Sequence, residues 1–246
     1  IKRKVRSAMM YPIVVLVIAL SMATAMLTLI VPQFEDIYKQ LGGDLPLPTR
    51  VVIAMSNAMI TFWWVYPILL AAIVAVVVQF QKNPKWKMKL HIFILKVPVF
   101  GPIVHKAAFA RLTLVLSSLM NSGVGLLEAL NLAGSSAGNL AIAAAFGRVH
   151  NKVREGSSLA FAMKAEPLIP EVMTELVGMG EETGTVPSLL DRYGKVLDDE
   201  VTTSVDGLTS LMEPLLIVFL GGIIGALVVA FWLPILNAPK LLEQQG

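Results

Sequence analysis

The chain has 246 residues, of which 56% are hydrophobic and only 15% are charged, and its mean hydropathy is +0.72. Soluble domains usually carry about 25% charged residues, so much of this chain must be kept away from water. The net charge is +3, and the absence of cysteine excludes disulfides, thiolate metal sites and a cysteine nucleophile. Because the first residue is Ile1 rather than methionine, we expect that a further N-terminal part has been lost.

Three stretches without charged residues are each long enough to cross a bilayer, which takes about 20 helical residues. All four tryptophans fall at predicted membrane borders, where an amphipathic ring is favoured. In the second stretch the aromatic cluster Phe62, Trp63, Trp64 and Tyr66 resembles an interface belt, which places the membrane core near 65–80. We therefore predict an all-α, polytopic membrane protein with three transmembrane helices. The predicted order is a basic flank at 1–8, a span at 9–31, an extracytoplasmic loop and lead-in at 32–60, a span at 61–80, a cytoplasmic helical domain at 81–213, a span at 214–237 and an extracytoplasmic tail at 238–246.

Basic residues indicate the orientation of the chain. Lys2, Arg3, Lys4 and Arg6 precede the first span, and several lysines follow the second, whereas the loop between these spans contains more acidic residues than basic ones. Short segments rich in Lys and Arg stay in the cytoplasm. We therefore expect the N-terminus and the helical domain in the cytoplasm and the C-terminus outside.

The predicted cytoplasmic domain has the pattern of amphipathic helices separated by glycines. Four apolar stripes with spacings of three and four residues are candidate core faces, and no stretch alternates with a period of two. The stripes begin at Phe109, Ile142, Val172 and Val186, the third consisting of Val172, Leu176 and Met179. We predict a six-helix bundle whose helices stop at glycines, namely Gly123 and Gly125, Gly134 and Gly138, Gly156, and Gly180 and Gly184.

Prolines bracket the first and third spans at equal intervals, as Pro12 and Pro32, and as Pro214 and Pro234. Each interval is about 30 Å of helix, one hydrocarbon thickness. Because a cytoplasmic domain precedes the third span, we expect that a matching domain preceded the first and that residues 1–8 are its end. Chance spacing of the prolines is the alternative. The last domain helix is expected to continue into the third span, unless the chain bends near Pro214.

Six segments of the chain carry a family resemblance. They are KVRSAMMYP (4–12), QFEDIYKQLGGDLPLPTR (33–50), FARLTLVLSSLMNSGVGLLEAL (109–130), VREGSSLAFAM (153–163), GMGEETGTVPSLL (178–190) and EPLLIVFLGGIIGALVVAFWLPI (213–235). In this order they resemble the type II secretion F protein family, the inner-membrane platform proteins of type IV pilus and type II secretion machines. Such proteins have two similar six-helix cytoplasmic domains and three spans, and this chain lacks the first domain. VPQFEDIYKQLG is more similar to the pilus branch.

The resemblance implies an assembly protein of the bacterial inner membrane, with no enzymatic activity and no cofactor. Family members lie beneath the growing pilus or pseudopilus as oligomers, beside other inner-membrane machine components. They couple a cytoplasmic hexameric ATPase to the insertion of pilin or pseudopilin subunits from the membrane. We therefore expect these partners and the lipid bilayer, and no nucleic acid.

Two groups of residues are the candidates for functional roles. The interaction or structural candidates are Arg111, Gly123, Glu128, Gly156, Gly180, Glu181 and Gly184. The candidates for packing and boundaries of the spans are Pro12, Pro32, Glu213, Pro214, Gly221, Gly225 and Pro234. Gly221 and Gly225 form a GxxxG pair, which suits close packing of helices either within one protomer or between subunits.

The other motifs in the sequence have structural rather than catalytic explanations. Gly134 to Gly138 fits the G-x-S-x-G nucleophile elbow, which needs a preceding strand, so a flexible turn between helices is favoured over a hydrolase that uses Ser136. Glu181 is expected to be a structural or interface group in a loop between helices rather than a metal ligand. The three histidines lie far apart in the sequence, without ligand spacing, and are expected at the surface or at interfaces.

A transporter or channel subunit is the main alternative to an assembly protein. Ionisable residues inside spans usually mark ion pathways, and the apolar cores of these spans contain none, which argues against transport. No P-loop motif is present, so energy must come from a partner.

Overall fold

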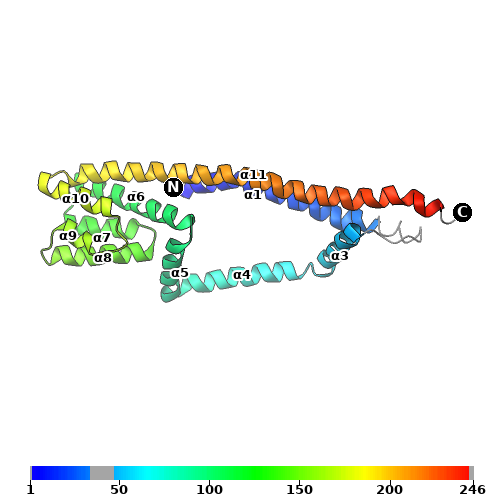
Figure 1. Cartoon of the computed structure of the whole chain (residues 1–246). Coiled ribbons are helices and arrows are strands. Elements are labelled where there is room, and N and C mark those ends of the chain that lie inside the picture. Colours follow the sequence, from blue (N-terminus) through cyan, green and yellow to red (C-terminus); the bar gives the residue numbers. More distant parts are fainter. Residues whose placement is uncertain (1, 34–46, 244–246) are drawn as a thin grey trace. The chain divides into compact units, whose positions relative to one another are not determined.

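The computed structural model describes residues 2–33 and 47–243, and every secondary-structure element in these ranges is a helix, as predicted. The chain divides into two compact units: unit 1 comprises Ile1–Val5 and Val77–Asp206, and unit 2 comprises Arg6–Val76 and Gly207–Gly246 (Figure 1). Parts of the predicted loop (34–46) and of the predicted tail (244–246) lie outside the described residues. The helices are α1 (Lys2–Ala25), η1 (Met26–Ile30), α3 (Leu47–Thr61), α4 (Val65–Lys82), α5 (Pro84–Lys96), α6 (Phe100–Asn121), α7 (Leu126–Ser136), α8 (Leu140–Arg154), α9 (Leu159–Lys164), α10 (Glu171–Thr183) and α11 (Val186–Glu243).

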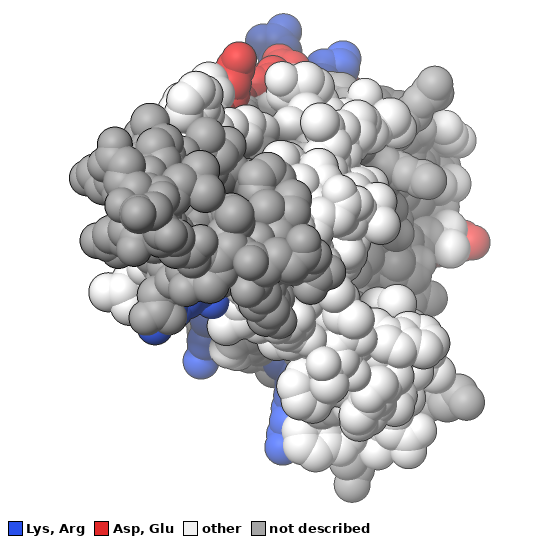
Figure 2. Space-filling view, turned by 90° about the vertical axis from the view of Figure 1, so that its right-hand side faces the viewer, with Lys and Arg blue, Asp and Glu red and all other residues white. Residues whose placement is uncertain are grey.

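Several described helices have the length and composition of membrane spans. Met9–Gln33 and Val186–Ala230 each qualify, with 11% of their most apolar stretch buried inside the protein, and Phe100–Asn121 qualifies with 39% buried. A further pair, Thr49–Thr61 and Val65–Val76, qualifies together and is bent by 64° at a break that contains Phe62, Trp63 and Trp64. Uncharged side chains form most of the described surface visible in Figure 2. The chain therefore has the all-α, polytopic membrane fold that was predicted.

The core of unit 1 lies between α6, α7, α8, α10 and the first part of α11. Phe109, Leu112 and Leu116 of α6 are fully buried, and the Phe109 ring lies 6.2 Å from that of Phe146 in α8. Burying one such side chain contributes about 1.5–3 kcal/mol. The apolar side chains of α6 therefore pack in the core of unit 1, and the predicted stripes of α6 and α8 face this core.

The predicted stripe of α10 is on the wrong face. Val172 and Met179 are each more than half exposed, whereas Met173 and Val177 are fully buried. Both faces have the right spacing, so periodicity alone did not separate them. Gly180 selects the buried face, because a Cβ at that position would lie 2.7 Å from the Cα of Val186 at the start of α11. Only glycine permits so close an approach of the two helices.

Two predicted turns are helical in the structure. Gly134, Ser135 and Ser136 form the end of α7, and the GEETG segment, predicted as a loop, continues α10 to Thr183. Glycine was taken as a stop signal, but Gly134 and Gly180 are buried where another element packs closely against the helix. The actual stop of α10 is Gly184, which has a left-handed backbone with φ of 73°.

The last helix continues as predicted, since α11 is a single helix from Val186 to Glu243. It includes Gly207, Pro214 and Pro234, the last of which is described in its backbone only. Proline inside a helix removes one backbone hydrogen bond, yet the helix is not interrupted at either position.

Unit 2 contains a feature that the sequence did not predict, a π-helical turn in the first span. The turn is η1, and it follows α1 directly. Leu27 and Val31 pack there against Ile53 of α3 and Leu227 of α11. Part of the predicted lead-in, residues 47–60, is therefore a helix packed onto the first and third spans. Single π-helical turns are rare and frequently mark functional positions.

Candidate functional site

Three turns of the helical domain lie at one end of unit 1, where α6, α8 and α10 finish. The Ser117 hydroxyl, near the end of α6, donates to the Pro187 carbonyl at the start of α11, 2.6 Å away. The Glu181 carboxylate, near the end of α10, reaches the start of α9. The turns that contain Gly123, Gly156 and Gly184 are thereby gathered into one surface, which we call the turn end, at the left of unit 1 in Figure 1.

Glu181 holds the first turn of α9. One carboxylate oxygen accepts the Leu159 N–H at 2.6 Å, and the other accepts the Ala160 N–H at 3.0 Å. The Ser158 hydroxyl accepts the next amide, that of Phe161, at 3.2 Å. Helix N-termini leave their first amides without intrahelical partners, so these two side chains complete the start of a helix of six residues. Both oxygens of Glu181 thus have a structural role.

An ion pair fixes the connection between α9 and α10. The guanidinium of Arg148 donates to both oxygens of Glu166, at 2.9 and 2.6 Å. Glu166 is 6% exposed, so its charge depends on this partner. The hydrogen bond to Glu166 also raises the pKa of Arg148. Nearby, the His105 Nε2 lies 2.7 Å from the Leu168 carbonyl oxygen, which ties α6 to the same connection.

Exposed apolar side chains are present on both α9 and α10. Phe161 is 67% exposed, and Val172 and Met179 are each more than half exposed. A cavity of about 490 Å³ adjoins Phe161 and is also lined by Glu171 and Glu175. We call Phe161, Val172 and Met179 the α10 patch. Val172 and Met179 are seven residues apart and therefore lie on one face of α10, and an exposed apolar face of this kind is typical of an interaction surface.

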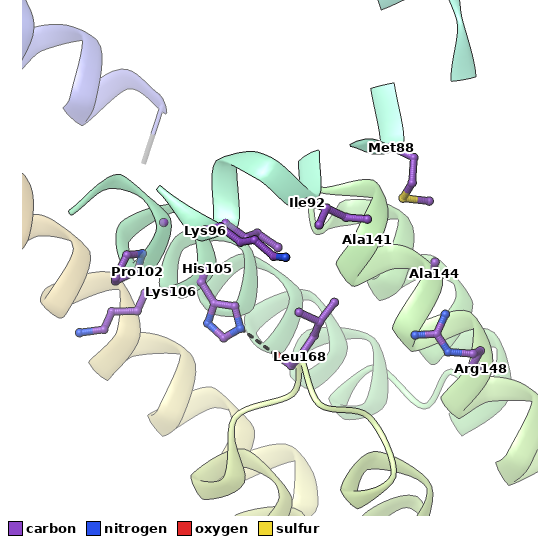
Figure 3. Close-up of a pocket in the computed structure, with 12 residues that line it drawn as sticks. Met88, Ile92, Lys96, Pro102, His105, Lys106, Ala141, Ala144, Arg148 and Leu168 are labelled. Carbon is purple, nitrogen blue, oxygen red and sulfur yellow. Dashed lines mark hydrogen bonds between the residues drawn. The ribbon is translucent and has the colours of Figure 1, made fainter. Parts of the chain in front are cut away.

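A larger cavity, of about 660 Å³, lies between α5, α6 and α8 (Figure 3). Met88, Ile92 and Leu95 supply part of its apolar lining, and the lining also includes Lys96 and Arg148. The close-up shows the hydrogen bond that joins the His105 ring to Leu168. The cavity has room for a hydrophobic group. The charge of Arg148 is already paired with Glu166, so Arg148 does not mark the cavity as a site for an anion.

The helix α5 is attached to the domain by His91. The Nδ1 atom of His91 accepts the Leu140 N–H at 2.8 Å, and the Asn139 side chain donates to the His91 carbonyl at 3.2 Å. Burial lowers the pKa of His91, and the charge of Lys87 lowers it further. The neutral ring is the form that can accept the amide proton.

Two hydroxyls connect the helices of unit 2. The Thr49 hydroxyl donates to the Ala230 carbonyl at 2.8 Å, and the Ser56 hydroxyl donates to the Leu27 carbonyl in η1. Both side chains are buried. In lipid, a carbonyl freed by an irregular turn needs such a partner, so Ser56 stabilises the π-helical turn. The sequence signal was a pair of hydroxyls seven residues apart, which lie on one face of α3.

The structure brings together only some of the predicted residues. Glu128 is exposed in the first turn of α7, and the Arg111 guanidinium lies against Gly138, where a Cβ would be 3.0 Å from Nη1. Gly221 and Gly225 face open space, so the GxxxG pair makes no close contact within the described part of the chain. Pro12 is buried within α1, Pro32 is half-buried just after η1, and Glu213 and Pro214 are exposed on α11. Sequence reasoning missed Thr49, Ser56, His91, Arg148 and Glu166.

The serine motif has helical rather than catalytic geometry. Ser135 and Ser136 donate to carbonyls of their own helix, those of Leu132 and Ala133, each at 2.7 Å. Within residues 2–33 and 47–243, no group of three or more His, Cys, Asp or Glu residues is placed to hold a metal ion.

Comparison with known proteins identifies the family. The model of the family described as "Type II secretion system (T2SS), protein F" matches residues 112–234, half of the chain. The chain belongs to this family. The matched region runs from within α6 to within α11, so it includes the turn end, the α10 patch and the GxxxG pair.

Members of the protein F family that resemble this chain include both pilus and secretion proteins. The chain is 37% identical to Type IV pilus assembly protein TapC of Aeromonas hydrophila, over 98% of the chain and 59% of the relative. It is 33% identical to Type IV pilus assembly protein PilC of Myxococcus xanthus, over 96% of the chain and 57% of the relative. It is 29% identical to Type II secretion system protein F of Pseudomonas aeruginosa, over 98% of the chain and 59% of the relative. The chain thus spans about three fifths of these relatives.

Proposed function

We propose that this chain is the membrane-embedded platform of a type IV pilus machine, without enzymatic activity of its own. In this role it couples a cytoplasmic hexameric ATPase to the insertion of pilin subunits drawn from the inner membrane. The observation that carries the proposal is the alignment of 98% of the chain with a type IV pilus assembly protein at 37% identity. The secretion relative is less similar, which favours the pilus machine.

The two units supply the two kinds of surface that such coupling requires. Unit 1 has an ordered helical core and an exposed α10 patch, which suits contact with another cytoplasmic protein. Unit 2 consists of apolar helices whose outer faces carry little polarity, which suits contact with membrane-embedded subunits or with other copies. In the proposed topology, the N-terminus and unit 1 are cytoplasmic and the C-terminus is extracytoplasmic.

We propose the α10 patch as the contact with the ATPase. It combines Phe161, Val172 and Met179 with carboxylates at Glu171 and Glu175, so a basic, partly apolar surface would complement it. Aromatic and methionine side chains are enriched at the centres of protein interfaces. Removing one such anchor often weakens binding by about 1–4 kcal/mol.

The proposed function is tested by deleting the gene and examining surface pili by electron microscopy, with pilin in the inner membrane measured in parallel. Normal pilin levels without pili are the expected result. Unchanged pili would contradict the pilus role and direct attention to a secretion machine.

The proposed ATPase contact needs a separate test. Phe161→Ser combined with Met179→Ser should abolish pilus formation and co-purification of the ATPase, while the protein remains at normal levels in the membrane. Val196→Ser is the matched control, because Val196 is a similarly exposed apolar residue on α11. If the control and the patch variant behave alike, the α10 patch is not the contact.

A further inference from the structure

The first cytoplasmic helix after α4 has an exposed apolar stripe. Trp86, Leu90 and Phe93 of α5 are 48%, 39% and 65% exposed. Their spacing of four and then three residues places them on one face of the helix. A soluble surface helix normally turns such a stripe towards its own core.

The orientation of α5 is fixed by its other face. Met88 and Leu95 are only partly exposed, and Leu95 packs against the core of unit 1. His91, on the same side, is bonded to the start of α8 through its ring and its carbonyl. The stripe therefore points away from the domain, while the opposite face of α5 packs against it.

Lysines flank the stripe on both sides. Lys87 and Lys89 are exposed, and the Lys89 Nζ lies 5.0 Å from the centre of the Trp86 ring. The sequence contains no acidic residue between Arg50 and Glu128, so no carboxylate of α4, α5 or α6 neutralises these charges. An apolar stripe between lysines is the pattern of a helix that lies in the surface of an anionic bilayer.

The chain places α5 next to the predicted cytoplasmic end of α4. The predicted second span ends at Phe80, α4 ends at Lys82, and α5 begins at Pro84. Trp86 is only six residues after Phe80 in the sequence, and the headgroup layer adds several ångströms to each side of the hydrocarbon. Amphipathic rings and long basic side chains both favour this layer.

We propose that α5 is an interfacial helix that binds anionic phospholipid on the cytoplasmic side of the membrane. Trp86, Leu90 and Phe93 enter the boundary between headgroups and acyl chains, and Lys87 and Lys89 contact lipid phosphates. An anionic surface is favoured over a protein partner because the lysines lie beside the stripe and directly follow the apolar α4. The inference rests on the proposed topology, in which α4 spans the bilayer.

The test uses the whole 246-residue chain with Trp86 as its single tryptophan, obtained by Trp63→Phe, Trp64→Phe and Trp232→Phe. The protein is reconstituted in nanodiscs of brominated phosphatidylcholine, with or without phosphatidylglycerol. We expect the bromine atoms to quench Trp86 emission, and more strongly when the anionic lipid is present. Each lysine near such a surface changes lipid binding by about fivefold. Lys87→Gln with Lys89→Gln should therefore remove most of the dependence on anionic lipid.

Controls separate this inference from the topology on which it rests. Lys152→Gln with Lys164→Gln removes the same charge from α8 and α9 and should leave the quenching unchanged. Ile73→Trp in a background without other tryptophans reports whether α4 enters the bilayer. Quenching in that variant without quenching of Trp86 overturns the inference and keeps the topology, whereas absence of both overturns the topology. Equal quenching in neutral and anionic discs overturns the role of anionic lipid.

The remaining outcome is that a protein, rather than lipid, shields Trp86. If Trp86 is unquenched by lipid and becomes shielded from acrylamide only when the ATPase is added, the stripe is a protein-docking surface and the lipid proposal is wrong.

Discussion

Replacing Glu181 by alanine should loosen α9 without unfolding the rest of unit 1. The variant removes the acceptor for two amides, those of Leu159 and Ala160, and leaves Ser158 bonded to Phe161. Hydrogen bonds to charged groups are worth about 1.5–3 kcal/mol, and loss of a helix cap costs about 0.5–2 kcal/mol. Because the Ala160 bond is solvent-exposed, we expect a total loss near 2 kcal/mol in the local opening free energy.

Hydrogen exchange followed by mass spectrometry on the detergent-solubilised chain measures this loss directly. A change of about 2 kcal/mol corresponds to about 30-fold lower protection of the first turn of α9. Glu181→Gln keeps one acceptor oxygen and should lose less. Glu182→Ala, at the exposed adjacent position, should leave protection within about twofold. Equal protection of α9 in the two alanine variants would refute the capping role.

Three further outcomes are expected from the ion pair, the membrane hydroxyl and the α5 histidine. Arg148→Met leaves the carboxylate of Glu166 buried and unpaired, so it should lower the free energy of unfolding by about 1–3 kcal/mol, and adding Glu166→Met should recover part of this loss in urea titrations. Ser56→Ala should cost about 0.6–1.7 kcal/mol in resistance to unfolding by sodium dodecyl sulfate, and an unchanged midpoint would contradict its role at η1. Burial and Lys87 lower the folded-state pKa of His91, so the unfolded chain binds more protons below about pH 6.5 and stability must fall there. Exchange at the start of α8 should accordingly speed up from pH 7.5 to 5.5, after correction for intrinsic rates, and His91→Gln should flatten this dependence.

Periodicity predicted the helical class and much of the core because repeated spacings report many residues at once. The stripes that begin at Phe109 and Ile142 face the core, and α11 continues through Pro214 as expected. Signals from single residues were less informative. Glycine at positions 134 and 180 was interpreted as a helix stop. In the structure, another segment packs so closely against the helix at both positions that little room is left for a side chain. That information lies in the partner segment, which local sequence does not specify.

The polar contacts of the candidate site were out of reach for a similar reason. Arg148 of α8 donates to Glu166 in the connection between α9 and α10. The His91 ring of α5 accepts the amide of Leu140, which lies 49 residues further along the chain. No local pattern links such residues, because the folded arrangement alone brings them together. Glu181 shows the limit most clearly, since its position was predicted as notable but its partners lie at the start of another helix.

In unit 2, the apolar surroundings give a single serine hydroxyl a structural role. In a soluble helix, the Ser56 hydroxyl would attract little attention, since water offers it many partners. In an apolar helix, Ser56 is almost fully buried and bonded to a carbonyl of a π-helical turn. A regular first span would leave that carbonyl bonded within its own helix, and η1 therefore makes a hydroxyl in α3 useful. Because the Ser56 hydroxyl bonds to a carbonyl of the irregular turn, substitutions in η1 and at Ser56 should have coupled rather than additive effects on the free energy of unfolding.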